Sequence, residues 1–173
     1  MKTYGSEPGA PTPVQVGISE LVVSDGDDTL KSYGLGSCLA IALYDPDSNI
    51  GGLAHIMLPD GDTAENSDRK PGKYADTAIR ALLRRMVERG ASYTTVEAKI
   101  AGGSDMFEFE SFGDGVGQRN IDAAREELEK LGVPVVATDV GGEYGRTVEF
   151  TPETGRLVVK TADEDAEDGV TEL

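Results

Sequence analysis

Cysteine, histidine and tryptophan are nearly absent from this chain. Its 173 residues include one cysteine, one histidine and no tryptophan. A single cysteine forms no internal disulfide, and one cysteine with one histidine gives too few ligands for a structural zinc site. We therefore expect a reducing compartment and no metal or other cofactor. The chain is long enough for one domain to bury a hydrophobic core without a disulfide or a structural metal.

Long apolar runs are absent as well. No segment approaches the roughly 18 consecutive apolar residues that a membrane span needs, and the first residues lack the basic-then-apolar order of a secretory signal. We expect a cytoplasmic protein with no direct membrane insertion.

Positive charge is scarce. The chain has 16 lysines and arginines against 32 aspartates and glutamates, a net charge of -16. This charge repels phosphates, so nucleic acids and anionic membranes are poor partners. It suits either a docking surface for a basic partner or a whole surface adapted to concentrated salt. Because the acidic residues are scattered along the chain as well as gathered at its end, we favour salt adaptation and a halophilic cytoplasm.

The two ends of the chain have little to bury. Residues 1–14 are rich in proline and glycine, which predicts a flexible arm. Residues 161–173 are crowded with acidic side chains and lack aromatics, which predicts a disordered tail. Residues 15–160 are left as one folded domain.

Periodicity within that domain predicts an α+β fold. Apolar residues recur at helical spacing in residues 74–89, which end at Gly90, and in residues 121–131, where Asn120 is the expected cap. Short β-branched or aliphatic runs predict strands at residues 18–23, 39–44, 52–58, 95–101, 133–138, 147–150 and 157–160. Several strands follow one another without a helix, and residues 153–155 suit a hairpin turn, so we expect mostly antiparallel sheet with two packed helices.

The only cysteine follows two closely spaced glycines in residues 34–38 (GLGSC), at the entrance to an apolar strand. Glycine lets the backbone approach a substrate and aim amide N–H groups at one point, as an oxyanion hole requires. The strand then reaches a turn at Asp45-Pro46-Asp47-Ser48 and returns. A turn centred between Pro46 and Asp47 places Cys38 directly opposite His55, on the face that Ala40 and Ala42 share.

This pattern alone leaves two interpretations open. A lone cysteine in an apolar stretch is more often a small buried hydrophobe than a nucleophile, and a lone histidine is commonly structural. The alternative is a Cys-His pair in which the imidazole activates the thiol.

Four segments in chain order resemble the signature segments of the CheD family of chemoreceptor glutamine deamidases. They are residues 34–38 (GLGSC), 54–59 (AHIMLP), 70–76 (KPGKYAD) and 98–103 (AKIAGG). The similarity continues through Arg119-Asn120 and residues 139–142, and covers residues 18–160 in all.

The resemblance implies a β-sandwich with flanking helices, related to toxin-type cysteine deamidases. It maps the nucleophile onto Cys38, its base onto His55, and the family's usual threonine onto Ser32, which keeps the hydroxyl. Backbone N–H groups near Gly36 and Ser37 would then hold the oxyanion. For Gly102 and Gly103, a lining of the substrate groove and a plain tight turn both remain open.

The resemblance also implies partners. The expected substrates are glutamine side chains on the cytoplasmic domains of chemoreceptors, and the expected regulatory partner is the phosphatase CheC. Two other functions remain: a mainly non-catalytic partner of CheC, and a structural protein whose Cys38 is inert.

Overall fold

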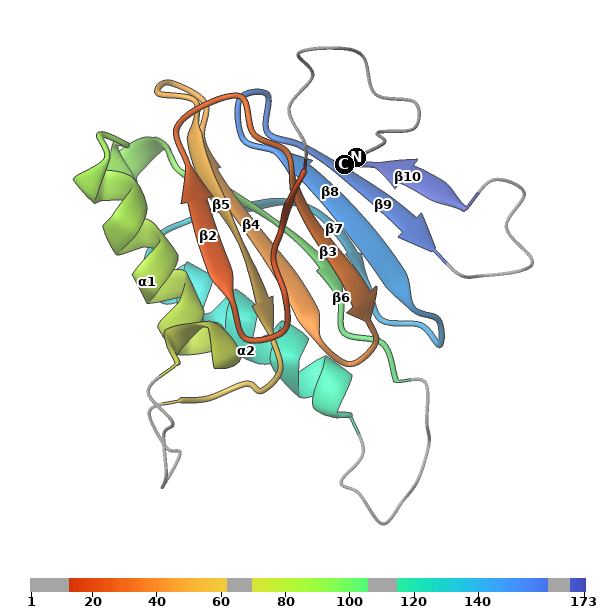
Figure 1. Cartoon of the computed structure of the whole chain (residues 1–173). Helices are drawn as coiled ribbons and strands as arrows, with labels where there is room; N and C mark the ends of the chain where they lie inside the picture. The colour runs from red at the N-terminus through yellow and green to blue at the C-terminus, as the bar shows by residue number, and fades with distance from the viewer. Residues whose placement is uncertain (1–12, 62–69, 106–114, 162–168) are drawn as a thin grey trace.

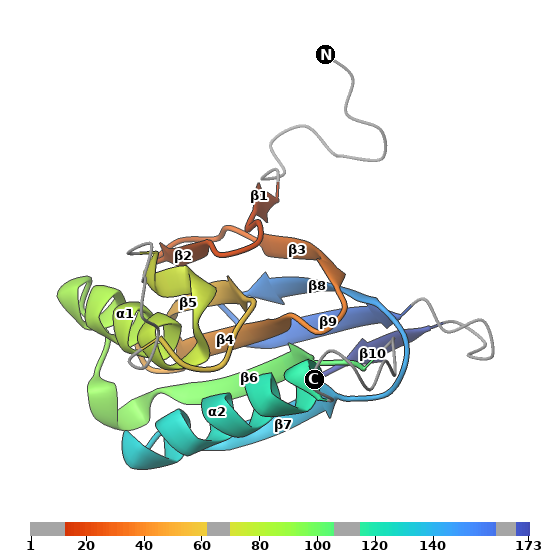
Figure 2. The same ribbon diagram turned by 90° about the horizontal axis from the view of Figure 1, so that it is seen from below.

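The structure, a computed structural model, describes residues 13–61, 70–105, 115–161 and 169–173. Within these residues, ten strands form two five-stranded sheets, and two α-helices cover one of the sheets (Figures 1 and 2). The expected α+β fold, a mostly antiparallel sandwich with two flanking helices, is confirmed.

The first sheet has the strand order β1, β3, β8, β9, β10. Its neighbouring strands are antiparallel except for β1 and β3, which run parallel. The strands span Val14–Gln15 (β1), Leu30–Leu35 (β3), Arg146–Thr151 (β8), Arg156–Thr161 (β9) and Val170–Glu172 (β10).

The second sheet has the order β2, β5, β4, β6, β7. Here the parallel pair is β6 and β7. The strands span Leu21–Ser24 (β2), Leu39–Asp45 (β4), Ile50–Ile56 (β5), Glu97–Gly102 (β6) and Val135–Val140 (β7).

The central strand β4 separates two hydrophobic cores, because its side chains alternate between the two faces of the sheet. Leu39, Ile41 and Leu43 point toward the helices and belong to the core beneath them. Ala40 and Ala42 point toward the first sheet, where they pack with side chains of both sheets, among them Leu53, Val148, Phe150, Leu157 and Val159. The predicted alternation along this strand is confirmed.

The first helix, α1 (Ala75–Glu88), follows its prediction to within a residue at each end. The apolar residues that recur at helical spacing in this segment, Ala75, Ile79, Leu82 and Met86, are buried. Gly90 takes a φ of 113°, the left-handed region that ends a helix at little cost for glycine. Short 3₁₀ turns lie on either side of α1, at Pro71–Lys73 and Tyr93–Thr95.

The second helix, α2 (Val116–Lys130), starts five residues before its predicted beginning. Asn120 was expected to cap it, but lies inside the helix, while Gly115 holds the capping position with a φ of 82°. The cap prediction is therefore wrong. It rested on local preference, whereas the side chain of Asn120 is engaged by distant parts of the chain.

The predicted strands all appear, as β2 and β4 to β9. The expected turn at residues 153–155 lies in the loop of the β8–β9 hairpin, in which Thr151 pairs with Arg156. Strand β3 was not predicted. Its sequence, LKSYGL, has no β-branched residue, and its pairing with β8 is irregular between Ser32 and Leu35.

The ends of the fold extend past the predicted domain. Val14 pairs with Leu30 in β1, although it was assigned to the flexible arm. Val170 to Glu172 form β10 against β9, so the prediction of disorder from residue 161 onward is wrong for these residues. Residues 1–12 and 162–168 lie outside the described part. No helix of the described residues is long and apolar enough to cross a membrane.

Candidate active site

Two of the predicted site residues meet across the inside of the sandwich. Ser32 on β3 and His55 on β5 belong to different sheets and are almost completely buried. The Ser32 Oγ lies 2.7 Å from Nδ1 of His55, and also 2.7 Å from the carbonyl oxygen of Val16. Three separate segments of the chain thus converge on this hydroxyl.

These contacts fix the protonation of the imidazole. The Val16 carbonyl can only accept, so the single hydroxyl proton of Ser32 goes to it. Ser32 Oγ must then accept from His55, which places the ring proton on Nδ1. The other ring nitrogen, Nε2, carries the lone pair and has no hydrogen-bond partner among the described residues. A buried imidazole with an unused lone pair is equipped to act as a base.

Cys38 lies immediately before β4, two positions ahead of Ala40, and packs against the core between the sheets. It is partly exposed, unlike Ser32 and His55. Because the side chains of alternate residues share a face, Cys38 lies on the side of the sheet from which His55 projects. The thiol therefore lies on the same side of the sheet as the imidazole, but is more exposed to solvent.

The predicted register of the hairpin is wrong by two residues. His55 pairs with Ala40, not with Cys38, because Asp45 pairs with Ile50 and leaves a loop of four residues. Asn49 takes a left-handed φ of 60°, and the Asp45 carboxylate accepts hydrogen bonds from Asp47 N and Ser48 Oγ. A slip of two keeps the faces unchanged, so Cys38 is diagonal to His55 rather than opposite it.

Burial shifts both groups toward their neutral forms. It raises the pKa of the Cys38 thiol. It also lowers the pKa of the His55 imidazole. The Val16 carbonyl and the Glu20 carboxylate raise this pKa, but by less than burial lowers it. The resting pair is thus a thiol and a neutral imidazole rather than an ion pair.

Hydrogen bonds to the carbonyl groups of residues 36–38 hold the loop that contains Cys38. Gly36 accepts a hydrogen bond from Ser104 N at 2.9 Å, and Cys38 accepts one from Gly103 N at 2.8 Å. The Ser37 carbonyl accepts from the side chain of Asn120 at 2.8 Å. Among the described residues, no hydrogen bond uses the backbone N–H of Gly36, Ser37 or Cys38. These amide donors, next to Cys38 in the chain, have no partner among the described residues.

Gly102 and Gly103 lie directly against this loop. A Cβ on Gly102 would come within 2.6 Å of the Cys38 carbonyl oxygen, and both glycines have positive φ, 109° and 66°. The close approach explains why glycine is needed at this point of the chain. It brings the turn after β6 to the candidate site.

Sequence reasoning missed the part that Asn120 plays. The side chain is fully buried and its amide nitrogen reaches both Ser37 and Met57, which lie 83 and 63 positions away in the chain. Its Oδ1 has no partner among the described residues. The one signal was that Arg119-Asn120 belongs to the segments resembling the family.

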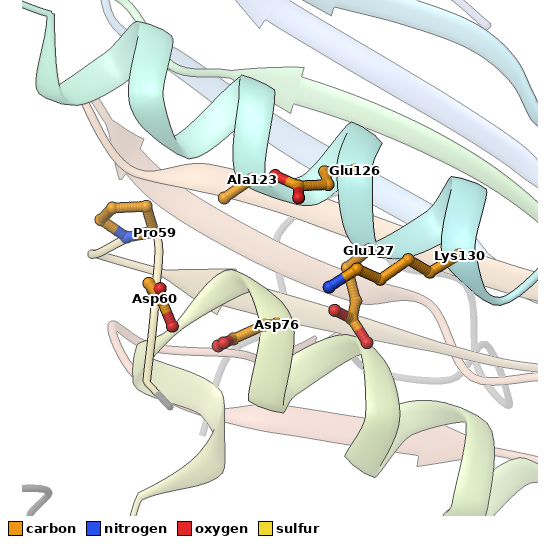
Figure 3. Close-up of a pocket in the computed structure, with 7 residues that line it drawn as sticks. All are labelled: Pro59, Asp60, Asp76, Ala123, Glu126, Glu127 and Lys130. Carbon is orange, nitrogen blue, oxygen red and sulfur yellow. The ribbon is translucent and has the colours of Figure 1, made fainter. Parts of the chain in front are cut away.

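A separate pocket lies between α1, α2 and the turn after β5 (Figure 3). Its lining residues are mostly acidic and include no cysteine, histidine or serine: Pro59, Asp60, Asp76, Ala123, Glu126, Glu127 and Lys130. Glu127 is buried, and its Oε2 lies 3.9 Å from Nε of Arg80. Another nitrogen of Arg80, Nη2, lies 3.8 Å from Oδ2 of Asp76. The pocket thus offers no thiol, hydroxyl or imidazole side chain.

No group of three or more His, Cys, Asp or Glu side chains in the described part of the chain is arranged to hold a metal ion. The groups of the candidate site that can take part in acyl transfer are the Cys38 thiol, the His55 imidazole, the Ser32 hydroxyl and the backbone amides of the loop.

Comparisons with known proteins point to one family. The family model described as CheD chemotactic sensory transduction matches residues 57–161. The "Probable chemoreceptor glutamine deamidase CheD" of Haloarcula marismortui is 42% identical over 165 residues, 95% of this chain and 94% of that protein. The "Chemoreceptor glutamine deamidase CheD" of Halalkalibacterium halodurans is 44% identical over 150 residues, 86% of this chain and 93% of that protein.

The "Chemoreceptor glutamine deamidase CheD" of Thermotoga maritima is 42% identical, over 84% of this chain and 89% of that protein. The family-model match begins after His55, so Ser32, Cys38 and His55 lie outside it. The alignment with the Haloarcula protein spans 95% of this chain and so includes all three. Among solved structures, the crystal structure of Bacillus licheniformis hypothetical protein YfiH aligns with a TM-score of 0.41 and 12% identity, covering 70% of this chain and 49% of that one.

Proposed function

The chain belongs to the CheD family, and from this premise we propose that it deamidates glutamine side chains on chemoreceptors, with Cys38 as nucleophile and His55 as base. The names of its relatives support the reaction and the substrate class. The contact between Ser32 and His55, and the free, partly exposed Cys38, support the choice of residues. A cytoplasmic location follows, because the receptor domains that carry such glutamines are cytoplasmic.

The observation that carries the proposal is the relay from Val16 through Ser32 to His55. It holds the ring by Nδ1 and leaves Nε2 as an unpartnered acceptor in a buried site. A buried nitrogen without a hydrogen-bond partner lowers the stability of the fold, so a chemical function explains its presence better than packing does. A base whose tautomer and orientation are fixed by a third group is the arrangement that nucleophilic hydrolases use.

The first half of the reaction uses the neutral pair. As the Cys38 sulfur attacks the carbon of the glutamine carboxamide, its proton passes to Nε2 of His55. The S–C bond forms and the carbonyl π electrons move to oxygen, giving a tetrahedral oxyanion. The imidazolium returns the proton to the amide nitrogen, the C–N bond breaks, and ammonia leaves a thioester on Cys38.

The second half removes the thioester. Water loses a proton to Nε2 and attacks the same carbon, and the C–S bond then breaks. The imidazolium hands its proton to the departing sulfur, so that glutamate and the free thiol result. Burial keeps both groups neutral before substrate binds. Proton transfer from the thiol to the imidazole therefore accompanies the attack, and no thiolate forms beforehand.

The oxyanion is stabilised by the loop before Cys38, in this proposal. The N–H groups of Ser37 and Cys38 are unused by the described residues and lie next to the nucleophile. Gly36 has no side chain to keep a substrate away from the backbone at this point. Gly102 lies against the carbonyl group of Cys38, and Gly103 N donates a hydrogen bond to that carbonyl. Losing one such donor typically costs about 2.7 to 4 kcal/mol in transition-state stabilisation.

We also propose the CheC phosphatase as a regulatory partner, on the family resemblance alone. A protein that served only as this partner would need no activated thiol. The buried Ser32–His55 contact and the free Nε2 favour the enzyme over that second function.

The test is to incubate purified protein with the cytoplasmic domain of a chemoreceptor and follow both ammonia release and peptide masses. Each converted glutamine should gain ~1 Da, as the acyl-transfer scheme requires. Cys38→Ser is the matched control, since it keeps the size of the side chain but replaces the thiol with a far weaker nucleophile. Masses that stay unchanged with the wild-type protein would refute the activity, and equal gains with Cys38→Ser would refute the nucleophile.

A further inference from the structure

Asn120 contacts both arms of the candidate site with a single side chain. Its amide nitrogen donates to the carbonyl of Ser37 at 2.8 Å and to the carbonyl of Met57 at 3.0 Å. Ser37 is bonded to the nucleophile Cys38, and Met57 is two positions after His55. Because both partners can only accept, the NH₂ end of the amide must face them, and both of its N–H bonds are used.

Helix α2 can bring Asn120 to this place because Gly117 has no side chain. A Cβ on Gly117 would lie 2.4 Å from the carbonyl oxygen of Gly103 and 2.6 Å from that of Ser104. The first turn of the helix therefore rests on the backbone after β6, the same backbone that holds the Cys38 loop. Asn120 follows Gly117 by three residues and is fully buried beneath the loop.

The contact with Ser37 determines where the N–H of Cys38 points. The carbonyl of Ser37 and the N–H of Cys38 belong to one planar peptide group, and in a trans peptide they point in opposite directions. When Asn120 holds the carbonyl, it turns the N–H of Cys38 away from α2 and fixes its direction. That N–H has no partner among the described residues.

The other two tethers of the loop are backbone groups. Ser104 N holds the Gly36 carbonyl and Gly103 N holds the Cys38 carbonyl, so substitution leaves both in place. Asn120 is thus the side chain on which the orientation of this peptide group depends.

We propose that Asn120 is a positioning residue that aims the N–H of Cys38 at the oxyanion of the tetrahedral intermediate. This role rests on the proposed deamidation. Asn120 itself touches no reacting atom. It acts through the peptide group between Ser37 and Cys38, and its second bond, to Met57, keeps the segment after His55 at a constant distance from that group.

If Asn120 has this role, its loss should affect one reaction of the Cys38 thiol and not another. Deamidation passes through an oxyanion, whereas alkylation of Cys38 by iodoacetamide is a displacement at carbon that forms none. Cys38 is the only cysteine, so alkylation reports on this thiol alone. Loss of the Asn120 amide should therefore slow deamidation and leave alkylation unchanged.

The experiment compares Asn120→Ala and Asn120→Asp with the wild type, on a chemoreceptor cytoplasmic domain from which the wild type releases ammonia. Asn120→Asp keeps the size of the side chain, opens no cavity, and loses the donors. We expect kcat and kcat/KM to fall together by about 10- to 100-fold, the pattern of an interaction made only in the transition state. At each pH tested, the rate of alkylation should stay within about twofold of the wild-type rate, a change that is small beside the expected loss of kcat.

Ala124→Gly is the matched control. It lies one turn further along the buried face of α2 and lowers helix stability without touching the loop. All variants are assayed at a temperature at which circular dichroism shows them folded. The control should retain the wild-type kcat. An equal loss in Ala124→Gly at the same folded fraction would assign the effect to stability and overturn the proposal.

Two further results would overturn it. If both Asn120 variants keep kcat within about twofold of the wild type, the loop holds its orientation without the amide, since a lost oxyanion donor costs far more. If alkylation slows in step with kcat, Asn120 supports the thiol or the imidazole rather than the N–H. If the wild-type protein itself releases no ammonia, the proposed deamidation is refuted. That result is distinct from those that refute the role of Asn120.

Discussion

The Ser32 hydroxyl lies 2.7 Å from Nδ1 of His55, although the two residues are 23 positions apart and belong to different sheets. The contact orients a ring whose other nitrogen has no partner in the described part of the chain. Serine provides a hydroxyl at this position but lacks the methyl group that would restrict the rotamer of a threonine. The hydrogen bond to Val16 restricts it instead.

Ser32→Ala should slow deamidation by roughly 10- to 1000-fold, because His55 loses the group that fixes its tautomer. Ser32→Thr is the control. It restores a hydroxyl at the same position and should retain most of the activity. Initial rates of ammonia release on a receptor domain measure both. Unchanged turnover in Ser32→Ala would show that another group orients His55.

Folding stability should fall as the pH drops below about 6.5, the ordinary pKa of histidine. Burial lowers the pKa of His55 in the folded state, so between the folded and unfolded pKa values the unfolded chain binds more protons. The contribution is complete above about pH 6.5 and is lost as the pH falls toward the folded pKa. Urea unfolding at pH 8, 7, 6 and 5.5, values chosen to bracket this window, measures it.

His55→Gln is the control for this slope. His55 is the only histidine, and no other side chain has an ordinary pKa in this window. The variant should show a flatter dependence of the unfolding free energy on pH between about 7 and 5.5. Parallel curves for the two proteins would mean that His55 takes up its proton equally well when folded.

Local patterns predicted much of the fold, and distant contacts account for what they missed. Helix α1 was predicted to within a residue because its apolar spacing and Gly90 are both local signals. Strand β3 lacks β-branched residues, and it carries Ser32, so periodicity could not place that residue in the site. Resemblance to a family supplied it.

The register of the β4–β5 hairpin shows a different limit. A proline at the second turn position suited a two-residue turn, but Asn49 can adopt a left-handed backbone and Asp45 can hold a longer loop with its carboxylate. Thr95 and Ser92, far along the chain, also donate to that carboxylate. The choice between the two loops depends on these contacts, which no local pattern reports.

The acidic surface leads to a prediction about salt. With a net charge of -16, the folded chain repels itself, and the repulsion reaches further as the Debye length grows from about 3 Å at 1 M salt to about 10 Å at 0.1 M. Lowering the salt concentration should therefore lower the melting temperature. Scans in potassium chloride over that range test it. A melting temperature that is constant or higher in low salt would contradict salt adaptation.

The last prediction separates catalysis from partner binding on one variant. Cys38→Ala removes only a sulfur atom from a partly exposed side chain, so the fold should keep its melting temperature and CheC should bind with nearly unchanged affinity. Ammonia release from a receptor domain should disappear, because no other thiol is present.

Calorimetry of CheC binding and the ammonia assay are run on the same preparation of Cys38→Ala. Surviving ammonia release would remove Cys38 from the mechanism. A marked loss of stability, about a kcal/mol or more, would instead identify Cys38 as a packing residue, since truncating a core side chain leaves a cavity. If activity and CheC binding vanish together in a folded protein, the thiol lies within a surface shared by both, and CheC should then compete with the receptor for it.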